Sequence, residues 1–347
     1  MLFDPRPKTR REDLFNRERE LSALHKASGK PLILVTGIRR IGKTSLINVF
    51  LNEVNATTII LDLRSLRPNY GYRELYGLVS QALTEKASTL AKLLKNVKGV
   101  KVAGLEIELR WRGRNAASLA TILDALNKGG RTIIALDEAQ KLRGPRAREV
   151  LEAIAHAYDY DENVTTILTG SEVGLLLEFV GIDNPESPLY GRYAEIISLE
   201  RFTREQSMQF LEEGFREAGI KATEEQLREA AEAFDGIPGW LTFYGNLSVS
   251  KGAPAPTSEV KELAIKIALN ELRNLIKARS RRYAHALKAI AKGARTWTQV
   301  KEAIETAEGT TISDSILHNI LTTLEKLSII RNYEFLDPIY KEAAVKL

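Results

Sequence analysis

Short apolar runs alternate with amphipathic segments through the first two hundred residues. Each run is rich in Ile, Val, Leu or Thr, as strands buried on both faces of a parallel sheet are. The segments between the runs repeat apolar positions at helical spacing. The pattern therefore predicts an α/β parallel sheet, with strands over 31–36, 57–63, 131–138, 164–170 and 194–199 and helices that include 45–54, 72–94 and 118–128.

Other parts of the chain have different patterns. Apolar and polar residues alternate over 100–111, around Ala103 and Gly104, which predicts a small hairpin. From Thr203 the pattern is wholly helical, and KGAPAPTS at 251–258 has the composition of a linker. A long helix is expected to end in KARSRRY, and an extended stretch is expected at 328–340. We therefore expect three domains, over 1–200, 201–256 and 257–347.

Composition limits the class of protein. The 347 residues are 44% hydrophobic and 27% charged, which is typical of soluble globular chains with more than one domain. No apolar run approaches the length of a membrane helix, and the N-terminus lacks the apolar core of a secretory signal. The absence of cysteine excludes disulfides and thiolate zinc sites, and four scattered histidines argue against a histidine metal cluster. We expect a cytoplasmic protein with no membrane partner.

The basic excess is concentrated near the C-terminus. Residues 257–347 hold 15 Lys+Arg and 11 Asp+Glu, a net charge of +4, whereas residues 1–256 hold 35 and 34, a net charge of +1. A partner of opposite charge would therefore meet the last quarter of the chain.

The stretch GIRRIGKTS at 37–45 follows the first predicted strand and precedes an amphipathic helix. Gly37, Gly42, Lys43 and Thr44 satisfy G-x-x-x-x-G-K-[ST], a loop whose backbone N–H groups surround the phosphates at a helix N-terminus. Lys43 is expected to reach the β- and γ-phosphates, and the Thr44 hydroxyl to bind Mg²⁺. The expected nucleotide-binding residues of the loop are Gly37, Arg39, Arg40, Ile41, Gly42, Lys43, Thr44 and Ser45.

Two carboxylates end the predicted strand IIALDEAQ at 133–140. Because ligands bind at the C-terminal edge of parallel sheets, Asp137 is expected to hold Mg²⁺ and Glu138 to act as the base that polarises the attacking water. The alternative is an acidic start to a helix, favoured by the helix dipole. Ser171, after strand 164–170, offers a hydroxyl that could monitor the γ-phosphate, or is an ordinary polar strand end.

Several motifs, in this order, resemble the archaeal ATPase family: FNRERELSAL at 15–24, GIRRIGKTSL, LDEAQ, ILTGS, PLYGR at 188–192 and GIPGWL at 236–241. That family belongs with the STAND group of signal-transduction ATPases, near the AAA+ and origin-recognition ATPases. The resemblance implies an ATP hydrolase with Mg²⁺ and ATP or ADP as ligands, in which oligomerisation is possible. It also implies the strand order 5-1-4-3-2.

The resemblance adds site residues one position at a time. Phe15, Asn16, Arg17 and Glu18 match a segment that lies along the adenine. Gly236, Ile237 and Pro238 match a Gly-x-Pro that opens a lid helix, although a rigid turn is an equal alternative. Ser171 matches the sensor position. Arg192 matches an arginine that can face the nucleotide, from its own chain or a neighbour, although it could equally pair with surface carboxylates.

Arg39 and Arg40 stand at loop positions whose side chains project outward while the backbone binds phosphate. We therefore expect that one of them clamps an acidic group of the lid or of the C-terminal domain, so that closure depends on nucleotide.

Residues 283–340 resemble a winged helix-turn-helix. The third helix, with Ser313 as its N-cap, has an apolar stripe of Ile316, Leu317, Ile320, Leu321, Leu324 and Leu327. Its polar face holds one lysine, no arginine and two carboxylates, which suits a DNA groove poorly. The basic run Lys277, Arg279, Arg281 and Arg282 either binds nucleic-acid backbone or is a solvated helix end.

The sequence thus predicts an ATP-hydrolysing switch that couples nucleotide state to a winged-helix domain. Two alternatives are a DNA-acting ATPase that uses the winged helix as its anchor, and a non-catalytic scaffold that holds nucleotide for stability.

Overall fold

The computed structural model describes residues 1–277 and 279–347. By its internal contacts the chain forms two compact units. The first unit holds Met1–Asn16, Ile38–Gly42 and Glu200–Leu347, and the second holds Arg17–Gly37 and Lys43–Leu199. The phosphate loop is thus shared: Ile38–Gly42 cluster with the C-terminal residues, and Gly37 and Lys43 with the sheet. The further division of the C-terminal part into lid and winged-helix domains stays a prediction.

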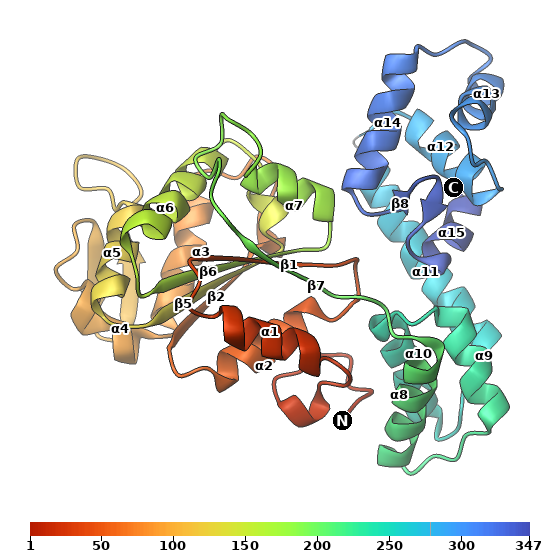
Figure 1. The fold of residues 1–347 in the computed structure, drawn as a ribbon, viewed down its shortest axis with the longest axis horizontal. Helices are drawn as coiled ribbons and strands as arrows, with labels where there is room; N and C mark the ends of the chain where they lie inside the picture. Colours follow the sequence, from red (N-terminus) through yellow and green to blue (C-terminus); the bar gives the residue numbers. More distant parts are fainter. Residues whose placement is uncertain (278) are drawn as a thin grey trace. The chain divides into compact units, whose positions relative to one another are not determined.

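The second unit is built on a five-stranded, wholly parallel sheet in the order β2-β5-β6-β1-β7 (Figure 1). Numbered along the chain without the separate β3–β4 hairpin, these strands follow the expected order 5-1-4-3-2. Every residue of β1, β5 and β6 is buried, as the continuous apolar runs predict. The strands are β1 Leu32–Thr36, β2 Thr57–Asp62, β5 Thr132–Asp137, β6 Val164–Gly170 and β7 Glu195–Ser198.

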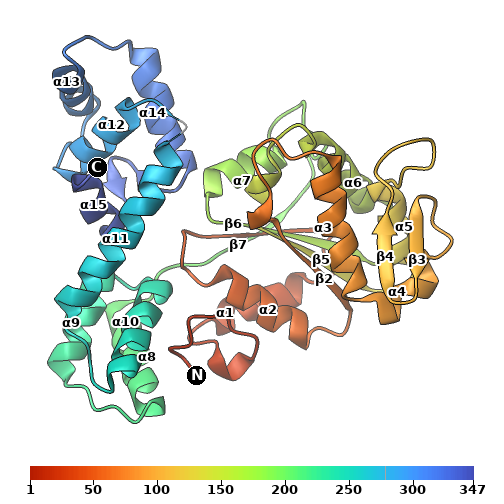
Figure 2. The ribbon, with the colours of Figure 1, turned by 180° about the vertical axis from the view of Figure 1, so that it is seen from behind.

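Helices cover both faces of this sheet (Figures 1 and 2). One face carries α1 Glu18–Ala27 and α2 Lys43–Glu53; the other carries α3 Tyr72–Thr84, α5 Leu119–Lys128, α6 Ala147–Tyr160 and α7 Val173–Val180. The prediction of a single helix over 72–94 is wrong. The segment is two helices, α3 and α4 Ala87–Leu94, because Lys86 leaves the helical conformation at φ −111° and ψ 17°. The break allows Leu83 of α3 and Leu90 of α4 both to be buried.

The predicted hairpin is confirmed as β3 Val100–Ala103 and β4 Glu106–Leu109. Two hydroxyls of α3 hold it in place, since Thr84 accepts a hydrogen bond from the Ile107 amide and Ser80 from the Leu109 amide, both at 3.0 Å.

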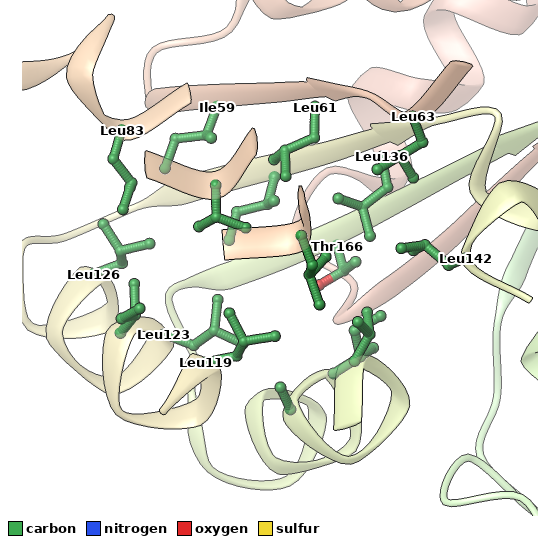
Figure 3. A pocket seen from close by; sticks show the side chains of 17 residues that line it. Ile59, Leu61, Leu63, Leu83, Leu119, Leu123, Leu126, Leu136, Leu142 and Thr166 are labelled. Carbon is green, nitrogen blue, oxygen red and sulfur yellow. The ribbon is translucent and has the colours of Figure 1, made fainter. Parts of the chain in front are cut away.

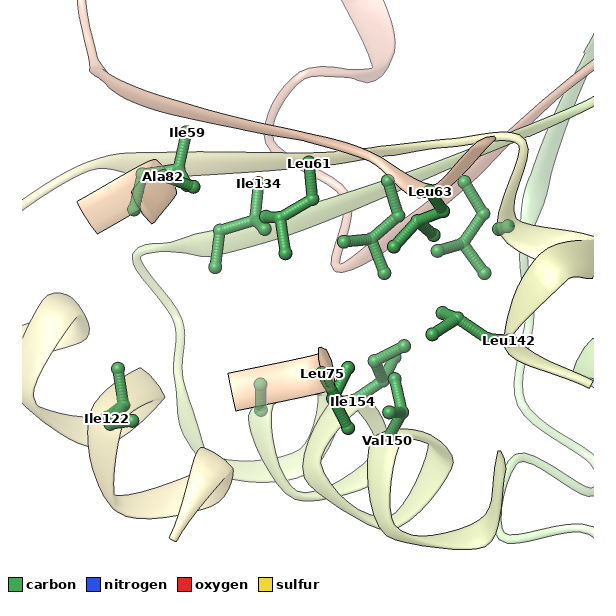
Figure 4. Packing of buried hydrophobic residues seen from close by; sticks show 14 of the residues in the cluster. Ile59, Leu61, Leu63, Leu75, Ala82, Ile122, Ile134, Leu142, Val150 and Ile154 are labelled. Carbon is green, nitrogen blue, oxygen red and sulfur yellow. The ribbon is translucent and has the colours of Figure 1, made fainter. Parts of the chain in front are cut away.

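The core of the second unit lies between the sheet and helices α3, α5 and α6. Leu75, Ile122 and Ile154 of these helices face Ile59, Leu61 and Ile134 of the strands (Figure 4). The same layer encloses an apolar cavity of about 80 Å³ (Figure 3). Its lining is aliphatic except for Thr166, so it offers a water molecule few polar partners.

In the first unit, α8 Arg204–Glu217, α9 Glu224–Phe234 and α10 Pro238–Lys251 are followed by the long helix α11 Thr257–Ile276. Thr203 and Thr223 begin α8 and α9 with capping boxes, each closed by a glutamine three residues later. Phe3 of the N-terminal segment packs edge-on against Phe210 and Phe215 of α8. Gly214 and Gly245 leave the space that its ring fills.

The C-terminal helices are α12 Arg282–Ala291, α13 Trp297–Glu308 and α14 Asp314–Lys326, followed by the short strands β8 Ile330–Arg331 and β9 Glu334–Phe335. Ser313 is the N-cap of α14, as predicted. Two expectations are wrong. Ile316 is 37% exposed and does not belong to the buried stripe. The stretch 328–340 is not extended throughout, because Asp337 caps a further helix, α15 Pro338–Val345, with Pro338 at its first position.

The helix expected to end in KARSRRY ends at Ile276, and residue 278 of that run lies outside the described residues. Among the helices in residues 1–277 and 279–347, none combines the length and apolar character needed to cross a membrane.

Candidate nucleotide-binding site

The phosphate loop joins the end of β1 to the start of α2. Gly42 has φ +99°, a backbone conformation that side chains rarely allow, and it faces open space. Lys43 begins α2 and is buried, and its Nζ donates a hydrogen bond of 2.8 Å to the Gly37 carbonyl oxygen. The lysine is therefore folded back over the loop, at a helix N-terminus that favours anions.

Thr44, the second residue of α2, meets Asp137, the last residue of β5. The Thr44 hydroxyl donates to Asp137 Oδ2 at 3.0 Å, and the Thr169 hydroxyl donates to Asp137 Oδ1. Asp137 is 2% exposed. A hydroxyl and a carboxylate are the hard oxygen ligands that Mg²⁺ prefers alongside water and phosphate. The residues present therefore fit a magnesium ion, and the expected ligand pair is brought together.

Glu138 and Ser171 are also brought together. The Ser171 hydroxyl donates to Glu138 Oε2 at 2.6 Å, and the Glu138 amide donates to the Thr169 hydroxyl at 3.1 Å. Glu138 itself adopts a left-handed backbone conformation, with φ 58° and ψ 48°. Non-glycine residues adopt this conformation at a cost of about 1–3 kcal/mol, typically where function requires it.

Sequence reasoning missed Gln140. Its Nε2 donates to the same Glu138 Oε2 at 2.5 Å. The side chain is buried, and its Oε1 has no hydrogen-bond partner among the described residues. A Cβ at Gly170 would lie 2.8 Å from this oxygen, so the glycine that ends β6 makes room for the amide. No spacing rule distinguishes Gln140 from a surface polar residue; only its burial beside Glu138 does.

In the first unit, Arg40 is held by three residues distant in sequence. It binds Glu271 of α11 with two hydrogen bonds, 3.0 and 2.5 Å long, and its guanidinium lies 4.0 Å from the centre of the Trp240 ring. Tyr340 of α15 donates to the same Glu271 carboxylate. The expected pairing of a loop arginine with an acidic residue of the lid or C-terminal region is therefore confirmed, for Arg40.

The backbone around Arg40 is equally constrained. Arg40 has φ +62°, and its carbonyl accepts a hydrogen bond of 2.9 Å from the Gly239 amide at the start of α10. A Cβ at Gly239 would lie 2.6 Å from Arg40 Cβ. Pro238 is the first residue of α10, and Gly236 before it has φ +69°. The Gly-x-Pro-Gly turn therefore packs directly on Arg40.

Burial affects the pKa values of three residues near Arg40: Glu271, Asp337 and Tyr340. Burial acts to raise the pKa of Glu271, but the hydrogen bonds and charge of Arg40 outweigh it and hold that pKa below its ordinary value. Burial raises the pKa of Asp337, although the Trp240 indole donates to its Oδ2 at 2.9 Å. Burial likewise raises the pKa of Tyr340, beside Glu271.

The remaining candidate residues have other surroundings. Arg192 binds Asp159 of α6 at 3.0 and 2.5 Å and the Pro188 carbonyl, the pairing with a surface carboxylate that was the alternative to a phosphate role. Arg17 is buried and pairs with Glu20 at 3.1 Å. Asn16 ends the N-terminal segment of the first unit with φ +50°. Arg39 lines a small pocket with Asp337 and Tyr340.

Comparisons with known proteins agree on the class of the chain. Residues 14–242 match the model of the ATPase domain predominantly from Archaea. Residues 277–343 match the C-terminal winged helix-turn-helix domain of MCM proteins. The structure is similar to the Walker-type ATPase of Pyrococcus abyssi, with a TM-score of 0.86 and 36% sequence identity over 99% of each chain.

A comparison with curated protein sequences gives no match. The Holliday junction branch migration motor RuvB of Thermotoga maritima matches at 14% identity and a TM-score of 0.46, covering 97% of each chain. That similarity is too low to support an argument about this chain. The match over 14–242 extends through both phosphate-loop and carboxylate motifs and covers most of the sequence. The chain therefore belongs to the family of ATPase domains found predominantly in Archaea.

Proposed function

We propose that the chain is a Mg²⁺-dependent ATP hydrolase that works as a molecular switch, in which nucleotide at the phosphate loop controls the orientation of the C-terminal winged helix. Lys43 would neutralise the β- and γ-phosphates, and Thr44 and Asp137 would hold the magnesium ion. When bound, the ion supplies positive charge that stabilises the phosphates during transfer. Asn16, Arg17, Gly236 and Pro238 would enclose the rest of the nucleotide, and Arg192 would face its phosphates only after leaving Asp159.

Glu138 is the proposed base. Its carboxylate oxygen Oε2 accepts hydrogen bonds from both Ser171 and Gln140. A carboxylate held by two donors is fixed in direction, and an attacking water would be activated once Glu138 directs an oxygen to it. Ser171 would sense the γ-phosphate, and its hydrogen bond would make the orientation of Glu138 depend on that phosphate.

The coupling rests on one observation: the Arg40 side chain and carbonyl are bound by α10 and α11. Arg40 lies in the middle of the phosphate loop, three residues before Lys43. Loops of this kind bind phosphate through their backbone N–H groups. A nucleotide that changes the backbone conformation at Arg40 would therefore weaken or break the hydrogen bonds of Arg40 with Glu271 and Gly239. This would change the free energy of opening of α10 and α11.

Hydrogen exchange tests this proposal directly. ATP should change the protection of α11 and α15 amides in the Glu138→Gln protein, which is expected to bind ATP without turnover, and the change should be absent when Arg40→Ala is added. Arg39→Ala is the matched control and should retain the response. An unchanged response of α11 and α15 to ATP in the Arg40→Ala variant would contradict the coupling, whereas loss of ATP binding in that variant would favour direct contact of Arg40 with phosphate.

The match to MCM winged-helix domains supports a second candidate function, an ATPase anchored on DNA. Two basic residues of this region are paired: Arg282 binds Glu308, and Lys301 binds Asp314 at the start of α14. Because the polar face of α14 holds one lysine and no arginine, binding of DNA would be led by contacts to its phosphate backbone and would be weakly sequence-specific. A gel shift with salt titration decides: a steep loss of binding with salt supports this function, and no binding at low salt removes it.

A further inference from the structure

Three potential metal ligands converge outside the nucleotide site, at the C-terminal ends of α5 and α6. Asp124 of α5, His156 of α6 and Asp161, the residue that ends α6, each place one ligand atom within 4.8 Å of the other two. His156 Nε2 and Asp124 Oδ1 are already 2.7 Å apart.

Asp161 is the unusual member of this group. It is 4% exposed, and its Oδ2 is buried without a hydrogen-bond partner among the described residues. A buried carboxylate oxygen that lacks a donor is costly unless a cation or proton compensates it. A cation at the point where the imidazole and the second carboxylate converge would compensate Asp161 Oδ2.

The side chains can reach coordination distances. Ligand atoms around a tetrahedral zinc ion with bonds of about 2.0–2.1 Å lie about 3.3 Å from one another. The His156–Asp124 pair would open slightly from 2.7 Å, and the wider separations, at most 4.8 Å, would close. The His156 and Asp124 side chains are 35% and 38% exposed, so both have room to adjust around the fixed Asp161.

We propose that Asp124, His156 and Asp161 form a second metal site, specific for a borderline divalent ion such as Zn²⁺ or Co²⁺, that clips the end of α5 to the end of α6. One imidazole nitrogen and two carboxylate oxygens make a three-ligand set with an open fourth position for water. The ligands differ from the oxygen-only pair Thr44–Asp137, so an imidazole-binding ion is favoured here and Mg²⁺ there.

The chain contains a matched control. His25 Nε2 lies 2.9 Å from Glu53, with side-chain exposures of 34% and 27%, so this pair resembles His156–Asp124 in distance and accessibility. Among the described residues, it belongs to no group of three potential ligands.

The test uses the nucleotide-free full chain in excess Mg²⁺, titrated with Zn²⁺ or Co²⁺. One Zn²⁺ should bind per chain, raise the melting temperature by several degrees at about a hundredfold excess over Kd, and Co²⁺ should give a visible absorption band. His156→Ala and Asp161→Asn should abolish both signals, while His25→Ala keeps them. Because His156 is only half-buried, its variant is informative even if Asp161→Asn fails to fold. No Zn²⁺-dependent shift in the wild-type protein, or an equal shift in His156→Ala, would overturn the proposal.

Discussion

Arg40 and Glu271 form a bidentate ion pair across a sequence separation of 231 residues. Both lie in the first unit, although Arg40 belongs to the phosphate loop. The pair is shielded by Trp240 and joined by Tyr340. Lys43 follows Arg40 by three residues in the sequence, so the ion pair ties the loop segment next to the proposed catalytic lysine to α11.

This ion pair should show energetic coupling. In a double-mutant cycle of Arg40→Ala and Glu271→Ala, with the opening free energy of α11 measured by hydrogen exchange, we expect a coupling of roughly 1–3 kcal/mol, as for partly buried neighbours. The exposed pair Arg204–Glu232, at 52% and 58% exposure, is the control and should couple by less than about 1 kcal/mol. Equal coupling in both cycles would refute the special role of Arg40.

The same pair predicts a pH dependence. The pKa of Glu271 is lowered in the folded protein, so its contribution to stability is complete above the unfolded pKa of about 4.3 and is lost as pH falls through the folded pKa. Melting temperature should therefore fall more steeply below pH 5 in the wild-type protein than in Glu271→Gln. Parallel pH profiles for the two proteins would show that Glu271 gains no stabilising charge interaction on folding.

Gln140 should act as a positioning residue for Glu138. Gln140→Ala removes one of the two donors on Glu138 Oε2, so kcat should fall by about 10–100-fold, the scale of a misaligned base, with ATP affinity unchanged. Gln209→Ala is the control, because Gln209 donates to Glu213 in the same way on an exposed helix face. An unaltered kcat in Gln140→Ala would exclude the positioning role.

Gly236 should be irreplaceable for steric rather than conformational reasons. It shares φ +69° with Gly252, but a Cβ at Gly236 would lie 2.0 Å from the Phe202 carbonyl oxygen, whereas Gly252 faces open space. Gly252→Ala should cost about 1 kcal/mol, the strain of a left-handed alanine, and Gly236→Ala clearly more. Thermal melting of the two variants compares their stabilities directly. Similar losses of stability would show that the Phe202 backbone shifts to make room for the added Cβ.

Much of the fold was predictable because its signals are local. The buried strands are continuous apolar runs, the loop glycines and Lys43 have fixed spacing, and Ser313 caps its helix through its own side chain. The partner of Arg40 was predictable only as an acidic group, because nothing local links residue 40 to residue 271. Gln140 escaped notice for the same reason. The helix begun by Pro338 was missed because an extended stretch was predicted up to residue 340, although proline at a first helical position, after an aspartate cap, is a helix start.

ATP turnover by the purified protein is the most direct test of the central claim, with Glu138→Gln and Lys43→Ala beside the wild-type protein. The wild-type protein should hydrolyse ATP only with Mg²⁺, Glu138→Gln should bind ATP and lose turnover by at least a hundredfold, and Lys43→Ala should lose both. Permanently bound ADP with negligible turnover would favour the non-catalytic scaffold. Wild-type turnover in Glu138→Gln would contradict the assigned base, and with it the proposed chemistry of the site.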